Sequence, residues 1–121
     1  MSDPRILIVE DDAERIAWFR RTFAEATKNI TGDTLEAIIL LGTHEYTHLY
    51  LDHDLGTEPR VGRDVARWLI DHPGVQPNLL TIVHSMNVVS ADKIVRELAD
   101  AGRPVLRMPF SVLAATDEVP A

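Results

Sequence analysis

Short apolar runs alternate with amphipathic segments about five times along this chain of 121 residues. The runs are rich in leucine, isoleucine and valine and cover residues 5–9, 48–51, 79–83 and 104–108, with a weaker run at 28–31. Continuous apolar runs of this length are typical of strands that are covered on both faces. Between them, apolar residues recur at helical spacing, as in Ile16, Phe19 and Phe23. This alternation predicts a parallel sheet with helices on both faces.

Few topologies are open to such a chain, because crossovers between parallel strands are right-handed. Five strands in one short α/β chain favour a flavodoxin-like, doubly wound sheet with the strand order 2-1-3-4-5. The length predicts a single domain over residues 1–121. Its last helix is expected to be short, near 111–115, and residues 116–121 are expected to fray.

The same patterns predict how the helices begin and which side chains they bury. Caps are expected at Asp12, Asp33 and Ser90. In the helix after Asp33, the core side is expected to carry Leu35, Ile38 and Ile39. Trp68 is expected in the core, and Trp18 lies off its helix's apolar stripe and is expected at the rim.

Composition excludes several classes of function. The 12 Lys+Arg against 19 Asp+Glu give a net charge of −7, which argues against binding to the backbone of DNA. Without cysteine there is no disulfide, thiolate catalysis or thiolate zinc site. No apolar run approaches a membrane span, and the first strand begins too early for a signal peptide. We therefore expect a cytoplasmic protein.

Polar clusters follow three of the predicted strands. Glu10-Asp11-Asp12 follows the first, Asp52-His53-Asp54 the third, and His84-Ser85-Met86-Asn87 the fourth. In open parallel sheets, ligands bind at the carboxyl ends of the strands, beside the switch point. Charged groups there are costly to bury unless they are paired or hold a metal. The clusters therefore predict a metal or phosphate site with Asp52 at its floor.

These residues resemble the receiver domains of two-component response regulators. The resemblance rests on residues 6–12, Leu51-Asp52, Ser85 and Met108-Pro109-Phe110. It implies that Glu10 and Asp11 are the acid pair, Asp52 the phosphoacceptor and Ser85 the conserved hydroxyl of that family. Met108 stands where receivers carry a lysine, and a thioether cannot hold a phosphoryl oxygen.

Two further blocks resemble a receiver offshoot, the cyclic-phosphate-processing receiver domains. They are Asp-His-Asp-Leu-Gly at 52–56, followed by residues 62–69, and Val-His-Ser-Met-Asn at 83–87. The resemblance implies hydrolysis or processing of a cyclic phosphate on a nucleotide or an RNA end.

The residues suggest how such chemistry would work. Mg²⁺, or Mn²⁺, takes oxygen ligands; Asp11 and Asp52 fit direct ligands of the metal, and Glu10 or Asp54 could act on it through water. His53 and His84 are candidates for the general acid and base. Phosphate oxygens are expected to bind Ser85, Asn87, Arg60 and Arg63. Either water or Asp52 itself could attack the phosphorus.

Several alternatives stay open from the residues. Side chains alternate along a strand, so if Ser85 faces the site, His84 turns away and is a structural histidine. The chain could be an enzyme, a metal-dependent cyclic phosphodiester hydrolase. It could instead be a stand-alone receiver that a histidine kinase or a small phosphoryl donor phosphorylates on Asp52. A third alternative is a pseudo-receiver, an interaction module without chemistry.

Overall fold

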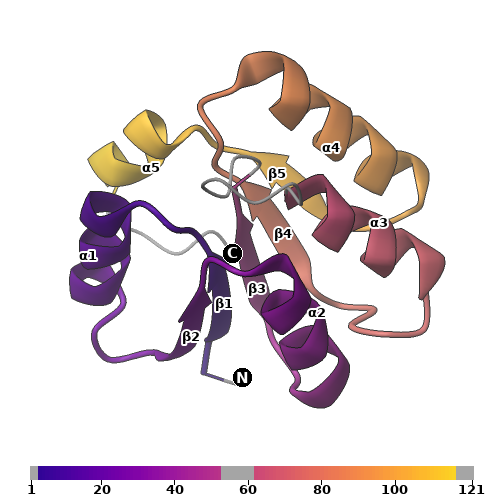
Figure 1. Cartoon of the computed structure of the whole chain (residues 1–121), viewed down its shortest axis with the longest axis horizontal. Helices are drawn as coiled ribbons and strands as arrows, with labels where there is room; N and C mark the ends of the chain where they lie inside the picture. Colours follow the sequence, from indigo (N-terminus) through magenta and orange to yellow (C-terminus); the bar gives the residue numbers. More distant parts are fainter. Residues whose placement is uncertain (1–2, 53–61, 117–121) are drawn as a thin grey trace.

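The computed structural model describes residues 3–52 and 62–116 of the chain. Along the sequence, strands and helices alternate: β1 (Arg5–Val9), α1 (Ala13–Thr22), β2 (Thr27–Thr31), α2 (Thr34–Thr43), β3 (His48–Leu51), α3 (Gly62–Asp71), β4 (Leu80–Val83), α4 (Val88–Asp100), β5 (Val105–Arg107) and α5 (Phe110–Thr116). The strands form one parallel sheet in the order β2-β1-β3-β4-β5 (Figure 1). The predicted fold class and strand order are therefore confirmed.

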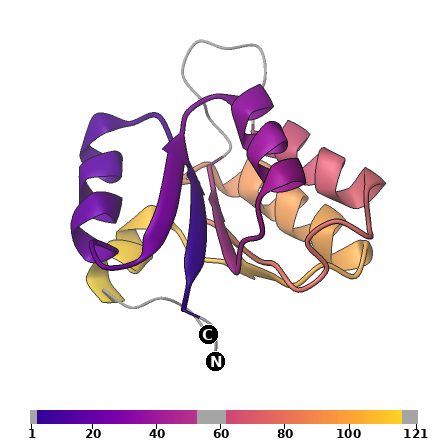
Figure 2. The same ribbon diagram turned by 90° about the horizontal axis from the view of Figure 1, so that it is seen from below.

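Alternation along each strand divides the core into two layers, one on each face of the sheet. Leu7, Val9, Leu51 and Val83 point toward α2, α3 and α4 and belong to one buried apolar cluster. Ile6, Ile8, Tyr50 and Ile82 belong to a second cluster, which Phe19 of α1 and Leu113 of α5 complete. Figure 2 shows the sheet between these two helical layers, with α1 and α5 together on one side.

The helix starts are partly as predicted. Asp12 and Asp33 cap α1 and α2, since their side chains accept hydrogen bonds from the backbone N–H groups of Arg15 at 3.0 Å and Leu35 at 2.9 Å. The prediction of Ser90 as a cap is wrong. Asn87 caps α4 and accepts a hydrogen bond from the Ser90 N–H at 3.1 Å, so the helix begins almost a turn earlier.

The predicted core side of α2 is also wrong. Leu35 and Ile39 are 48% and 62% exposed, whereas Ala37 and Leu41 are buried. Leucine and isoleucine occur all around this helix, so the sequence pattern does not reveal which side packs on the sheet. Trp68 is only partly buried against its cluster, and Trp18 is half-buried as expected.

Within the described ranges, no helix is long and apolar enough to cross a membrane.

Candidate functional site

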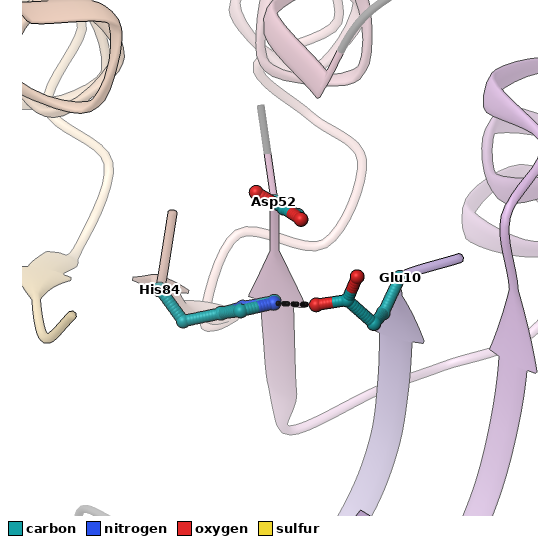
Figure 3. Close-up of side chains that lie close together, drawn as sticks. All are labelled: Glu10, Asp52 and His84. Carbon is teal, nitrogen blue, oxygen red and sulfur yellow. Dashed lines mark hydrogen bonds and ion pairs between the residues drawn. The ribbon is translucent and has the colours of Figure 1, made fainter. Parts of the chain in front are cut away.

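Three side chains with titratable groups occupy one row across the sheet, one residue beyond the ends of β1, β3 and β4. Val9, Leu51 and Val83 are neighbours in register, and the ladder continues because the N–H groups of Asp52 and His84 donate to the carbonyls of Val9 and Leu51. The next residues, Glu10, Asp52 and His84, therefore lie side by side (Figure 3).

The direction of this row follows from strand alternation. Glu10, Asp52 and His84 share the parity of Ile8, Tyr50 and Ile82, so they project toward the α1 and α5 side of the sheet. All three are buried, with Glu10 and His84 fully inaccessible and Asp52 3% exposed.

The carboxylate of Glu10 is held at both oxygens. Its Oε1 accepts from Nε2 of His84 at 2.8 Å, and its Oε2 accepts from the backbone N–H groups of Asp11 and Asp12, both at 3.1 Å. Burial alone would raise the pKa of Glu10, but the hydrogen bonds from His84 and the Asp12 backbone outweigh it and leave that pKa below its ordinary value. Glu10 is therefore a carboxylate near neutral pH, and Nε2 of His84 carries the proton between them.

His84 faces Glu10 from inside the aromatic part of the core. Its ring centroid lies 5.3 Å from that of Phe19 and 6.4 Å from those of Tyr50 and Phe110. Its Nδ1 is buried and has no hydrogen-bond partner among the described residues. His84 is therefore neither a histidine that lines the open hollow nor a purely structural one that turns away from the site. Its ring is buried in the core, and its polar contact is with Glu10, an acid of the site.

Asp52 has few compensating partners for its charge. The Arg15 guanidinium is 3.5 Å from its Oδ2 and 3.8 Å from Oε1 of Glu10. Burial, with the nearby negative charge of Glu10, raises the pKa of Asp52 to about 6. Two close acids therefore share one half-exposed arginine and the imidazole of His84.

Above this row lies a hollow of about 460 Å³, which we name the acidic hollow. Its walls are formed by Glu10, Asp11, Asp12, Arg15, Asp52, Ser85 and Met86. Ser85 is buried, and its Oγ accepts a hydrogen bond from the N–H of Asn87 at 3.1 Å. Asp11 is largely exposed. The small part of its carboxyl environment that is shielded from water, together with the charge of Glu10, raises its pKa. The predicted acids of β1 and β3 and the predicted hydroxyl thus meet in one cavity.

Arg15 is the residue that the sequence interpretation missed. It lies on the first turn of α1, three positions after the cap Asp12, and reaches both Glu10 and Asp52. Its guanidinium also lies over the ring of Phe110, 5.2 Å from the centroid. The signal was present, because a residue three positions after an N-cap shares the side of that cap on the helix.

Other predicted site residues lie apart from this hollow or outside the described residues. Asn87 is exposed and caps α4. Arg63 is paired with Glu97 of α4, with Nε and one terminal nitrogen both 2.9 Å from Oε1, and it does not line the hollow. His53, Asp54 and Arg60 fall outside the described residues. Their roles stay predictions.

The donor set of the acidic hollow fits a hard divalent cation. Ligand atoms of Glu10, Asp52 and His84 lie within 4.8 Å of one another. Nε2 of His84 donates to Glu10 and His84 does not line the hollow, so the ligand atoms offered there are carboxylate oxygens, to which Asp11 adds its own. Oxygen ligands suit Mg²⁺ or Mn²⁺, and a cation would offset the shared negative charge that raises the pKa of Asp52.

Comparisons with solved structures return receiver domains. The signal receiver domain of a putative LuxO repressor protein from Vibrio parahaemolyticus matches with a TM-score of 0.67 and 18% identity, over 96% of this chain and 90% of that one. A CheY-like receiver domain protein from Methanospirillum hungatei gives 0.71 and 16%, over 94% and 86%. A response regulator from Burkholderia pseudomallei, with a phosphorylated aspartic acid and a calcium ion, gives 0.66 and 18%, over 93% and 66%.

The chain has the fold of response-regulator receiver domains. Residues 6–100 match the family described as the cyclic-phosphate processing receiver domain, and the chain belongs to that family. The resemblance inferred from the sequence blocks is therefore confirmed. No curated protein matches the chain.

Proposed function

We propose that this receiver domain opens cyclic phosphodiesters in a reaction that depends on a divalent cation. The observation that carries the proposal is the row of Glu10, Asp52 and His84 beneath a hollow that also holds Arg15 and Ser85. The family description supports the substrate class. When bound by Asp11, Asp52 and Glu10, the cation would neutralise charge that develops on the phosphoryl oxygens.

Arg15 supplies the positive charge for the phosphate that receivers obtain from a lysine at the position of Met108. Met108 is partly buried against the core cluster of Ile6 and Ile8, so the segment after β5 offers no cation to the hollow at this position. Arg15 brings a guanidinium to the same place from α1, 3.5 Å from Asp52. A guanidinium binds phosphate oxygens in pairs, which suits the two non-bridging oxygens of a cyclic phosphodiester.

Asp52 is the catalytic residue of the proposal. A water attacks phosphorus, the phosphorus–oxygen bond of the ring breaks, and the freed sugar oxygen takes up a proton to leave a phosphomonoester. The Asp52 carboxylate would accept one proton of the attacking water and return it to the freed sugar oxygen. In the other route, Asp52 attacks phosphorus and forms an acyl phosphate that water then hydrolyses.

His84 acts through Glu10 rather than on the substrate. It is fully buried and donates to Glu10 Oε1 at 2.8 Å, so it fixes the orientation and the charge of that carboxylate. This makes His84 a positioning residue, a smaller role than the general acid or base expected from the sequence. A direct acid or base role for His53 stays a prediction.

The experiment is incubation with Mg²⁺ and a panel of cyclic phosphates that includes nucleoside 2′,3′-cyclic phosphates. We expect turnover that EDTA abolishes, that Asp52→Asn reduces at least a hundredfold, and that Asp100→Asn, a matched charge removal at the far end of α4, leaves unchanged. Intact-mass measurement after an acid quench separates the two routes, because attack by Asp52 leaves a nucleotide adduct on the protein. No turnover of any cyclic phosphate would overturn the proposal.

A second candidate function is that of a phosphorylated receiver. It is favoured by the position of Asp52 at the end of β3 in a response-regulator fold, beside Ser85 in the same hollow. In that case a histidine kinase or a small phosphoryl donor would be the partner. A stable adduct of phosphoryl mass after acetyl phosphate treatment, absent in Asp52→Asn, would favour it. If neither chemistry is found, the pseudo-receiver remains.

A further inference from the structure

A second hollow adjoins the acidic hollow on the α1 side of the molecule. Its volume is about 600 Å³, and we name it the aromatic hollow, lined chiefly by Asp12, Arg15, Ala17, Trp18, Arg21 and Phe110. Asp12 and Arg15 belong to the walls of both hollows. The two cavities are therefore neighbours that meet at the first turn of α1.

The aromatic hollow has a rigid wall of two half-buried rings. Trp18 and Phe110 meet edge to face with centroids 5.3 Å apart. Trp18 is also held by Phe19 and Phe23, at 5.0 and 6.0 Å. Rings that are fixed from below and still reach the surface offer flat apolar area at little loss of side-chain entropy.

Arg15 joins the two hollows. One of its terminal nitrogens is 3.5 Å from Oδ2 of Asp52, while its guanidinium carbon lies 5.2 Å from the centre of the Phe110 ring. One guanidinium therefore contacts the acidic floor and the aromatic wall together. A ligand whose phosphate group binds at Asp52 would have the aromatic hollow beside it, because Asp12 and Arg15 line both cavities.

We propose that the aromatic hollow binds the nucleobase of a nucleoside cyclic phosphate whose phosphate lies in the acidic hollow. The inference rests on the proposed function for the position of the phosphate. Aromatic faces and arginine planes are the groups on which proteins stack bases, and stacking accepts any base because each has a π-face. The net charge of −7 favours a mononucleotide over a long RNA, whose binding needs a basic surface.

The test uses Trp18 as its own reporter. Trp68→Phe leaves Trp18 as the single tryptophan, and the protein is titrated in Mg²⁺ with adenosine 2′,3′-cyclic phosphate and with glycerol 1,2-cyclic phosphate, which has no base. We expect saturable quenching of Trp18 emission by the adenosine compound only. By calorimetry, Trp18→Leu should weaken binding of the adenosine compound about tenfold and leave binding of the glycerol compound unchanged. Trp18→Phe, which keeps a ring, should recover most of the affinity.

The outcomes separate this inference from the proposed reaction. Base-dependent binding without turnover would support the nucleobase site and overturn the reaction. Turnover of both compounds with equal kcat/KM, unaffected by Trp18→Leu, would overturn the nucleobase site and leave the reaction standing. A short oligoribonucleotide that ends in the same cyclic phosphate identifies the source of the ligand: tighter binding than the mononucleotide points to RNA ends, and equal binding points to free nucleotides. Thermal unfolding of each variant verifies that it is folded.

Discussion

At the scale of single residues, the acids of the row have opposite electrostatic environments. Glu10 accepts three hydrogen bonds and has a lowered pKa, while the cation nearest to Asp52 among the described residues is Arg15 at 3.5 Å and the pKa of Asp52 is raised to about 6. The direction of each shift decides how the residue contributes to stability. Glu10 stabilises the fold as a carboxylate, and Asp52 destabilises it as one.

Asp52→Asn should therefore stabilise the metal-free protein. An acid whose folded pKa exceeds its unfolded value, here 3.8, weakens the fold once it ionises, so the penalty is complete above the folded pKa of about 6 and disappears below 3.8. We expect the variant to gain on the order of 1–3 kcal/mol at pH 8 and the gain to vanish as the pH falls to about 4. Urea unfolding of both proteins in EDTA between pH 4 and 8 measures this difference in the free energy of unfolding. A variant less stable than the wild type at pH 8 would contradict the assignment.

His84→Ala tests the buried pair. It leaves the Glu10 carboxylate with its two backbone donors but without its side-chain donor, and loss of a donor from a buried charged acceptor costs about 3 kcal/mol or more. We expect the free energy of unfolding of His84→Ala to be about 3 kcal/mol lower than that of the wild type at pH 7. The difference in stability between the wild type and His84→Ala should narrow as the pH falls below 4.5, the ordinary pKa of a glutamate, because the wild type then loses the stability that its lowered Glu10 pKa provides.

His84→Gln is the matched variant, since its amide N–H can reach the same oxygen. It should retain part of the lost stability, and Glu10→Gln combined with His84→Ala should be more stable than His84→Ala alone. Chemical denaturation of this double-mutant cycle gives the coupling. Equal stability of His84→Ala and His84→Gln would show that the ring's packing, not its N–H, is what matters.

At the scale of the elements, the turn between β2 and α2 supports the acid cluster from the side. The N–H of Glu10 donates to the carbonyl of Thr31 at 2.9 Å, which brings Gly32 against Asp11. A Cβ placed on Gly32 would lie 2.8 Å from the Cβ of Asp11. The absent side chain is therefore what lets Asp11 keep its position at the rim of the acidic hollow.

Gly32→Ala should consequently displace Asp11 and weaken divalent-cation binding. We expect the dissociation constant for Mg²⁺ to rise about tenfold or more, together with roughly 1–3 kcal/mol lost from overpacking. Gly74→Ala is the control, because a Cβ there meets nothing within 4 Å. Calorimetric titration with Mg²⁺ compares the two. If Gly32→Ala binds Mg²⁺ as tightly as the wild type, Asp11 is not one of the ligands of the cation.

At the scale of the whole molecule, negative charge is in excess overall and is concentrated at the carboxyl edge of the sheet. The net charge is −7, and within residues 3–52 and 62–116 the hollow is lined by four acids and one arginine. A cation that binds only the folded protein raises the free energy of unfolding as its concentration exceeds the dissociation constant. Stability and cation binding are therefore linked in this fold.

Mg²⁺ should raise the Tm by several degrees more than NaCl of equal ionic strength. At a hundredfold excess over the dissociation constant the gain is about 2.7 kcal/mol, which is several degrees for a chain of this size. Asp11→Asn should lose most of this difference, while Asp100→Asn, which removes the same charge at the end of α4, should retain it. Scanning calorimetry with and without EDTA measures the shifts. Identical behaviour of both variants would indicate general charge screening in place of a bound cation.

The sequence by itself determined the fold and the edge at which the acids gather. Apolar runs alternating with helices specify a doubly wound parallel sheet, and polar residues directly after β1, β3 and β4 specify its carboxyl edge, because both are local patterns of the chain. The sheet order and the meeting of Glu10, Asp11, Asp52 and Ser85 could be predicted on this basis.

Tertiary structure decided which side chains face one another. Alternation continued past the end of β4 predicted that Ser85 and His84 point apart, but the register across β1, β3 and β4 sets His84 beside Glu10. Arg15 reaches Asp52 only because α1 packs next to that row, and Leu35 is exposed because packing selects one side of a helix that carries leucine and isoleucine all around. Contacts between segments distant in sequence depend on register and packing, and neither is encoded in a local pattern of residues.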